Sequence, residues 1–266
     1  MITTIKNLGF LLKPRNIALI GAALAASSLP NLSFGNVQER VQKADAAMQK
    51  LNEPGLNFEQ LANLCAVAER EYTEALFENP NDCGALAGFG DYKLKTGYPN
   101  KAIPHLEKAA EMCKDKRALE LLISAYIEVK DYDSADKFAD VLLQQNKNSA
   151  YAHGQKGFIH WVKGEYNEAI ADCEKAVAID PNLFRVFNCL AGAYEGLNDL
   201  ENAKNCAEQA VIINPKYSNG HFMLGLLYKK MDKKKEAVAE LKKAVELALE
   251  ADNFREALIS AEKMLK

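Results

Sequence analysis

Small and apolar residues recur along most of this chain at an almost constant interval. The clearest series consists of alanines separated by 34, 33, 34, 34 and 34 residues: Ala68, Ala102, Ala135, Ala169, Ala203 and Ala237. Seven residues after each stands a second apolar residue: Ala75, Ala109, Leu142, Ala176, Ala210 and Ala244. A spacing of seven keeps both residues on one helix face, so each unit contains an amphipathic helix. Six units in one register indicate a repeat protein.

Each unit also carries the pattern of a second helix. Aromatic rings recur at intervals of 34 residues at Tyr126, His160, Tyr194 and Tyr228, and small residues do so at Gly157, Ala191 and Gly225. Between the two helices stand Gly164, Asn198 and Asp232, residue types that suit a left-handed turn or a cap. We therefore predict antiparallel helix pairs, in which small facing residues such as Gly157 and Ala169 let the backbones approach closely.

The two ends of the chain depart from this pattern. Pro54-Gly55 interrupts the place of a first helix, which predicts helices near 36–50 and 57–78 as a degenerate repeat or cap. The resulting division is an N-terminal helix pair over 36–82, five repeats over 83–250 and a C-terminal capping helix over 251–266. Terminal units of a solenoid must shield its apolar edge from water, so atypical ends are expected.

Residues 1–35 have the layout of an export signal. Three cations precede an uncharged run from Ile17 to Leu29, Pro30 follows, and the first acidic residue is Glu39. Cleavage after Ser33-Phe34-Gly35 or near Ala23-Leu24-Ala25 would fit the preference for small residues. The apolar run is shorter than the roughly 20 residues of a spanning helix. We therefore expect a periplasmic or otherwise exported protein with no membrane span in the mature chain; an uncleaved anchor and a mitochondrial-type presequence are the alternatives.

Charge narrows the choice of partners. Three of the 33 basic side chains lie in the leader, so 30 basic and 36 acidic residues remain, a net charge of −6. Nucleic-acid binding relies on concentrated Lys and Arg, so this balance argues against nucleic acid as the main partner.

The repeat resembles the tetratricopeptide repeat, whose 34-residue motif runs Trp-x2-Leu-Gly-x2-Tyr, Ala-x3-Phe and Pro. The nearest unit reads His221-x2-Leu224-Gly225-x2-Tyr228 and Ala237-x3-Leu241, without the final proline, and the preceding one ends at Pro215. The resemblance covers about residues 57–250. It implies an all-α, right-handed superhelical solenoid that binds a protein partner in a concave groove.

In that family the first helix of each repeat lines the groove. The corresponding positions here are Arg117, Glu120, Ser124, Tyr151, Phe158, Trp161, Arg185, Asn188, Glu195, Asn219, Phe222 and Lys229. We expect the aromatic members to anchor a partner segment and the polar members to fix its register. The alternative is that the aromatic rings pack against neighbouring helices or an N-terminal segment. The Lys and Asn set that binds chaperone C-terminal carboxylates is not matched, since Gly154, Phe158, Asn188 and Cys189 occupy its places.

No pattern points to catalysis, a cofactor or a metal. The sequence contains no phosphate loop, nucleophile elbow or calcium loop, so we predict that the protein is not an enzyme. His153 and His160 share a helix face seven residues apart, but both occupy positions of core aromatics, which favours packing over metal binding.

Six cysteines are compatible with disulfides in an exported chain, although none forms a Cys-x-x-Cys pair. Cys173 with Cys189, and Cys189 with Cys206, stand on helices predicted to pack together and are the candidate pairs. Buried free thiols are the alternative.

The sequence thus predicts a protein-interaction scaffold or adaptor, most simply of the bacterial cell envelope. The alternative is a homo-oligomeric structural or assembly protein of the envelope.

Overall fold

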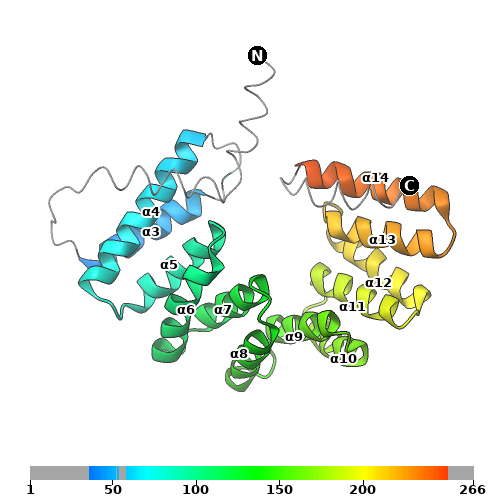
Figure 1. The fold of residues 1–266 in the computed structure, drawn as a ribbon, viewed down its shortest axis with the longest axis horizontal. Coiled ribbons are helices and arrows are strands. Elements are labelled where there is room, and N and C mark those ends of the chain that lie inside the picture. The colour runs from blue at the N-terminus through cyan, green and yellow to red at the C-terminus, as the bar shows by residue number, and fades with distance from the viewer. Residues whose placement is uncertain (1–35, 52, 54–57, 251–266) are drawn as a thin grey trace, which may run out of the picture. The chain divides into compact units, whose positions relative to one another are not determined.

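The computed structural model describes residues 36–51, 53 and 58–250; the predicted leader and the C-terminal helix over 251–266 lie outside this part (Figure 1). The described residues form twelve α-helices and no strand, which confirms the all-α repeat fold. The helices are α3 (Val37–Lys50), α4 (Phe58–Glu78), α5 (Cys83–Lys95), α6 (Pro99–Cys113), α7 (Lys116–Glu128), α8 (Tyr132–Gln145), α9 (Ala150–Lys163), α10 (Tyr166–Ile179), α11 (Phe184–Gly196), α12 (Leu200–Ile213), α13 (Ser218–Lys230) and α14 (Lys234–Glu250).

The chain divides into two compact units, with the boundary inside α8. Unit 1 comprises residues 1–138 and unit 2 residues 139–266. In unit 1, α3 packs on α4 and α5 on α6, while α5 also touches α3 and α7. In unit 2 the hairpins are α9 with α10, α11 with α12 and α13 with α14, and α11 touches both α9 and α13. Within each unit, the first helices of successive hairpins are therefore neighbours.

Caps and turns explain where the helices begin and end. The side chains of Asp82, Ser149 and Asp199 accept backbone N–H bonds at the starts of α5, α9 and α12, which satisfies donors that a helix start leaves unpaired. Gly164, Asn198 and Asp232 adopt left-handed backbone, with φ of 80°, 61° and 57°. These residues were predicted to form the turns between paired helices, and that prediction is confirmed.

The recurring small residues form the contact between paired helices. Both series of repeat positions are buried, from Ala68 and Ala75 to Ala237 and Ala244. At Gly157, a Cβ would lie 3.1 Å from the carbonyl oxygen of Ala169 and would run into the Cys173 sulfur. Close backbone approach between α9 and α10 therefore requires glycine at this position.

Gly157→Ala is accordingly expected to lower the free energy of unfolding of unit 2 by about 1–2 kcal/mol, because overpacking outweighs the gain in helix propensity. Urea denaturation followed by the fluorescence of Trp161, the single tryptophan, measures this. Gly84→Ala is the control, followed by hydrogen exchange of peptides from α5 because Gly84 lies in unit 1: its Cβ would meet Asp82 and Val41 at an ordinary 3.4 Å, so we expect little change in stability. Equal effects of the two substitutions would contradict the packing argument.

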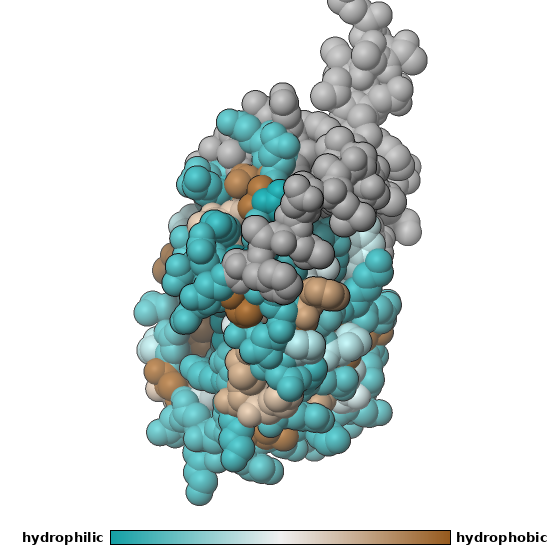
Figure 2. All heavy atoms as spheres, turned by 90° about the vertical axis from the view of Figure 1, so that its left-hand side faces the viewer, coloured by the Kyte–Doolittle hydropathy of each residue, from teal (hydrophilic) through white to brown (hydrophobic). Residues whose placement is uncertain are grey.

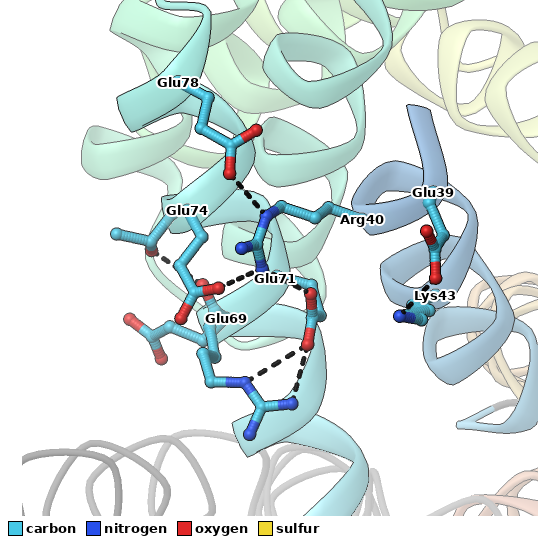
Figure 3. A network of polar contacts seen from close by, with 9 residues as sticks. Glu39, Arg40, Lys43, Glu69, Glu71, Glu74 and Glu78 are labelled. Carbon is cyan, nitrogen blue, oxygen red and sulfur yellow. Dashed lines mark hydrogen bonds and ion pairs between the residues drawn. The ribbon is translucent and has the colours of Figure 1, made fainter. Parts of the chain in front are cut away.

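An arginine between α3 and α4 fastens the N-terminal hairpin (Figure 3). The Arg40 side chain, 9% exposed, contacts the carboxylates of Glu71, Glu74 and Glu78 on α4, with Nε 2.9 Å from Glu78 and Nη1 3.2 Å from Glu71. Burial alone would lower the pKa of Arg40, but the hydrogen bond to Glu78 and the charge of Glu74 outweigh burial and raise it. One guanidinium thus joins α3 to two turns of α4.

The face on which α3 and α4 lie is mainly polar. Figure 2 shows hydrophilic side chains over most of this face, with apolar ones scattered between them. Among the helices of the described residues, none combines the length and apolar character needed to cross a membrane.

Candidate functional site

The first helices of unit 2 bring together nine of the sequence-predicted site residues. We call the set the first-helix face; its members come from α9, α11 and α13, which lie side by side: Tyr151, Phe158, Trp161, Arg185, Asn188, Glu195, Asn219, Phe222 and Lys229. Arg185, Asn219 and Lys229 are exposed and the other six are half-buried. All nine thus retain some solvent-accessible surface.

Two of the aromatic side chains have a structural role. The Phe158 and Trp161 rings meet edge to face with centroids 5.7 Å apart, and both pack on the cluster that contains Val186 and Leu190. The indole covers Gly192, where a Cβ would come within 2.7 Å of the ring. Trp161 therefore helps to hold α9 against α11, so packing against a neighbouring helix accounts for part of its burial.

The polar members Arg185, near the start of α11, and Asn219, near the start of α13, both lie close to Tyr217. Phe184 and Tyr217 stack edge to face at 4.8 Å between these helix ends, and Arg185 lies over the Phe184 ring. Burial raises the pKa of Tyr217, while a hydrogen bond with Asn219 and the charge of Arg185 act in the opposite direction. The aromatic pair thus supports two exposed hydrogen-bonding side chains at one edge of the face.

Two further polar residues lie on α11. The buried Oδ1 of Asn188 has no hydrogen-bond partner within the described part of the chain. At the next-to-last position of the helix, Glu195 forms an ion pair with Lys230 of α13. The pair crosses from α11 to α13, so it helps to keep these two helices in register.

The other three predicted site residues belong to unit 1. Arg117 contacts Asp91 at 2.8 Å, and the Ser124 hydroxyl donates to the carbonyl of Glu120. Arg117 also borders a pocket of about 130 Å³ between α3, α5 and α7, whose other lining residues are Asp45, Met48, Gln49, Asp91 and Lys95. The sequence did not indicate this pocket, because its lining comes from three separate repeats.

Histidines of unit 2 face carboxylates. The ring nitrogens of His153 and His160 lie 3.7 and 3.5 Å from the two oxygens of the buried Asp172, and Lys175 pairs with the same carboxylate at 3.0 Å. Within the described residues, no group of three or more His, Cys, Asp or Glu side chains is arranged to hold a metal ion.

The disulfide prediction was wrong in its choice of partners. The bond joins Cys83, the first residue of α5, to Cys113, the last residue of α6, with Cα atoms 6.1 Å apart. Cys173, Cys189 and Cys206 are free thiols. A hydrogen bond with Cys189, together with burial, raises the pKa of Cys173, and burial raises the pKa of Cys206 to about 11. These thiols fill the core between α10, α11 and α12.

The first-helix face lies within repeats that match a known family. Models described as tetratricopeptide repeat match residues 150–183, 185–217 and 219–250, the three hairpins of unit 2. A comparison with curated protein sequences finds no match.

Solved structures with the same fold include MamA (41-end) from Desulfovibrio magneticus RS-1, at 26% identity and a TM-score of 0.53, covering 63% of this chain and 96% of that one. A tetratricopeptide-repeat protein from Parabacteroides merdae covers 94% and 98% at 18% identity and a TM-score of 0.62. The thermophilic protein TTC0263 from Thermus thermophilus covers 73% and 100% at 18% identity and a TM-score of 0.55. Residues 150–250 thus consist of tetratricopeptide repeats, which generally serve as non-catalytic protein-interaction scaffolds.

Proposed function

We propose that this chain is an exported adaptor of the bacterial cell envelope that binds a segment of a partner protein on the first-helix face of unit 2. One observation carries the proposal: partly exposed aromatic rings and hydrogen-bonding side chains lie together on three adjacent helices. Hot spots of protein interfaces are built from such aromatic and arginine side chains.

The aromatic and the polar residues of the first-helix face would contribute to binding in different ways. Tyr151 and Phe222 are half-buried, so a partner's apolar side chain would cover aromatic surface that water now reaches. Arg185 and Asn219 are exposed, and both lie close to Tyr217. Their side chains would form hydrogen bonds with the partner's backbone or polar groups. Apolar burial supplies affinity and the hydrogen bonds fix the register of the segment.

Export is supported by two independent features. The leader has cations, then an uncharged stretch and no acidic residue before Glu39. The Cys83–Cys113 disulfide joins the open end of a hairpin, and structural disulfides persist mainly in oxidising compartments such as the periplasm. An adaptor in that compartment would meet envelope proteins.

Phe222→Ala is expected to weaken partner binding by about 2 kcal/mol, roughly 30-fold, the cost of losing an aromatic hot spot. The measurement is quantitative mass spectrometry of proteins retained from envelope extract by the wild-type chain and by the variant. Phe222 suits this test better than Trp161, because the indole of Trp161 also packs on Gly192.

The control for this experiment is Ile212→Ala on α12, a residue that is 66% exposed and outside the first-helix face. A partner lost equally with both variants, or retained by Phe222→Ala with its fold intact, would contradict the proposed surface. Light scattering distinguishes the homo-oligomeric alternative: the adaptor is expected to be monomeric in the absence of its partner.

Cell fractionation of the full chain, followed by mass spectrometry of its N-terminus, tests export directly. The expected product is a shortened chain in the envelope fraction, with Cys83 joined to Cys113. A full-length, fully reduced chain in the cytosol would contradict this part of the proposal.

A further inference from the structure

The pocket of unit 1 brings charged side chains of both signs together in a small space. Two carboxylates and two cations line it, and a thioether and an amide complete the lining: Asp45, Asp91, Lys95, Arg117, Met48 and Gln49. Its volume of about 130 Å³ is well below the roughly 300–1,000 Å³ of sites for drug-sized ligands. A pocket of this size admits a small molecule or the tip of one side chain.

One buried carboxylate holds the two cations together. The side chain of Asp91 is 10% exposed, and its Oδ2 lies 2.8 Å from Nη2 of Arg117 and 3.4 Å from Nζ of Lys95. The side chains of Arg117 and Lys95 are themselves 57% and 41% exposed. A guanidinium and an ammonium each carry more N–H donors than this one oxygen can accept. Both cations therefore keep donors for a second acceptor that enters from solvent.

A second carboxylate comes from α3. Oδ1 of Asp45 accepts a hydrogen bond of 2.5 Å from the hydroxyl of Tyr72 on α4. The side chain of Tyr72 is fully buried, so it fixes the position of the carboxylate. The other oxygen, Oδ2, forms no hydrogen bond or ion pair within the described part of the chain. Asp45 thus has an oxygen left to accept a hydrogen bond from a ligand in the pocket.

Both carboxylates lie within electrostatic reach of the same guanidinium. Burial alone would lower the pKa of Arg117, but the hydrogen bond to Asp91 and the charges of Asp91 and Asp45 outweigh burial and raise it. Arg117 pairs directly with Asp91, whereas the described residues contain no hydrogen bond or ion pair between Arg117 and Asp45. The pocket therefore separates a negative group on α3 from positive groups on α5 and α7.

This separation of charge disfavours ligands that carry a single charge. The lining has two negative and two positive side chains, so a simple cation at Asp45 would meet the positive charges of Arg117 and Lys95. A simple anion between those cations would meet Asp91 and Asp45, and like charges at close range are costly. A small zwitterion satisfies both sides, and its charge-assisted hydrogen bonds are stronger than those of a neutral amide.

We propose that the pocket of unit 1 binds a free α-amino acid, whose carboxylate pairs with Arg117 and Lys95 and whose ammonium group pairs with Asp45. The amide of Gln49 supplies a further polar contact, and Met48 offers apolar surface to a short side chain. The site uses no residue of the first-helix face, so it is a second binding function beside the adaptor role and does not depend on it.

A ligand in this position connects α3 to the helices that follow it. Asp45 lies on α3, Lys95 on α5 and Arg117 on α7, and α5 packs against both α3 and α7. The amino acid would bind only while α3 is in place, because the ammonium contact is lost when α3 moves away. Binding to the closed form alone stabilises it by mass action, so the ligand is expected to slow the opening of α3.

The experiment is hydrogen exchange of the full chain over residues 37–50, with and without about 50 mM L-alanine at constant pH and ionic strength. For a dissociation constant of about 5 mM or less, exchange of α3 should slow by about 10-fold or more. Propionate and ethylammonium keep the carbon skeleton of alanine but only one of its charges, and neither should slow exchange. No effect of alanine, or an equal effect of either analogue, would overturn the proposal.

Two substitutions remove one charge each. Asp45→Asn keeps an oxygen acceptor for the Tyr72 hydroxyl, and Arg117→Gln leaves Lys95 beside Asp91; both are expected to abolish the effect of alanine. The matched control is Lys116→Gln: Lys116 is 61% exposed and does not line the pocket, so alanine should protect this variant as it does the wild type.

A full alanine effect in both Asp45→Asn and Arg117→Gln would contradict the assigned site. If either variant fails to keep α3 folded, the comparison of alanine with its two singly charged analogues on the wild-type chain decides, since it requires no substitution.

Discussion

Breaking the Cys83–Cys113 disulfide is expected to lower the free energy of unfolding of unit 1 by about 3–4 kcal/mol, because it frees a loop with a sequence separation of 30 residues. The bond closes the hairpin of α5 and α6 at its open end, where the short turn exerts no constraint. The measurement is urea-dependent hydrogen exchange of peptides from α5 and α6 in the wild type and in Cys83→Ser with Cys113→Ser.

The free thiols provide the control for the disulfide. Cys206→Ser removes a half-buried thiol that takes no part in the bond and should leave the exchange of α5 and α6 unchanged. A thiol reagent should label four cysteines of the unreduced, denatured chain, and two more after reduction. Six labelled thiols before reduction, or a double variant as stable as the wild type, would contradict the assignment.

Arg40→Met is expected to cost about 3–5 kcal/mol, since removing one partner leaves buried carboxylates uncompensated. The side chain of Glu71 is 7% exposed and that of Glu78 is 15% exposed. Water therefore solvates these two carboxylates poorly when the guanidinium is removed. The guanidinium of Arg70 still pairs with Glu71 in the variant, but that arginine is half exposed. The expected result is loss of α3 from α4, measured as fast hydrogen exchange over residues 37–50 under conditions where α6 stays protected.

Lys43→Met is the matched substitution on the same helix. Lys43 pairs with Glu39 at 2.7 Å, but both side chains are more than half exposed, and solvent and salt screen such exposed pairs so that they add little to stability. Figure 3 shows the two sites on α3. If both variants exchanged alike over residues 37–50, the cluster around Arg40 would have no special part in fastening α3.

The repeating part of the fold was predictable because a close helix contact admits few residue types. Gly157 and Ala169 revealed the packing of α9 on α10, and Asn198 and Asp232 revealed the left-handed turns. These are local constraints, and the repeat copies them at a fixed interval, so that each unit supports the interpretation of the next.

Contacts that occur in only one repeat were not predictable from the repeat length. Cys83 and Cys113 stand at the first and last positions of a hairpin, which was a usable signal, but the three cysteines of α10, α11 and α12 offered equally plausible pairs. Arg40 reaches three glutamates from a helix that departs from the repeat pattern. At the candidate site, the repeat located the exposed first-helix positions, while the packing of Trp161 on Gly192 depended on side-chain geometry.

The contacts of His153 and His221 are intermediate between the repeated and the single contacts. Each ring faces the carbonyl oxygen six residues earlier and a carboxylate 19 residues later. The offsets of six and 19 residues are constant, yet the acceptor is a backbone carbonyl in one contact and either Asp or Glu in the other. A search for identical residues does not detect such a pattern. It becomes visible only when hydrogen-bond partners are compared at equivalent positions of successive repeats.

Site-specific photo-crosslinking in cells tests the central claim most directly. A photoreactive residue replaces Asn219, on the first-helix face, or Ile212, which is 66% exposed on α12. The adaptor function predicts that position 219 captures one distinct polypeptide, that position 212 does not, and that Phe222→Ala reduces the capture. Equal capture from both positions, or capture only of a second copy of this chain, would contradict partner binding on the first-helix face.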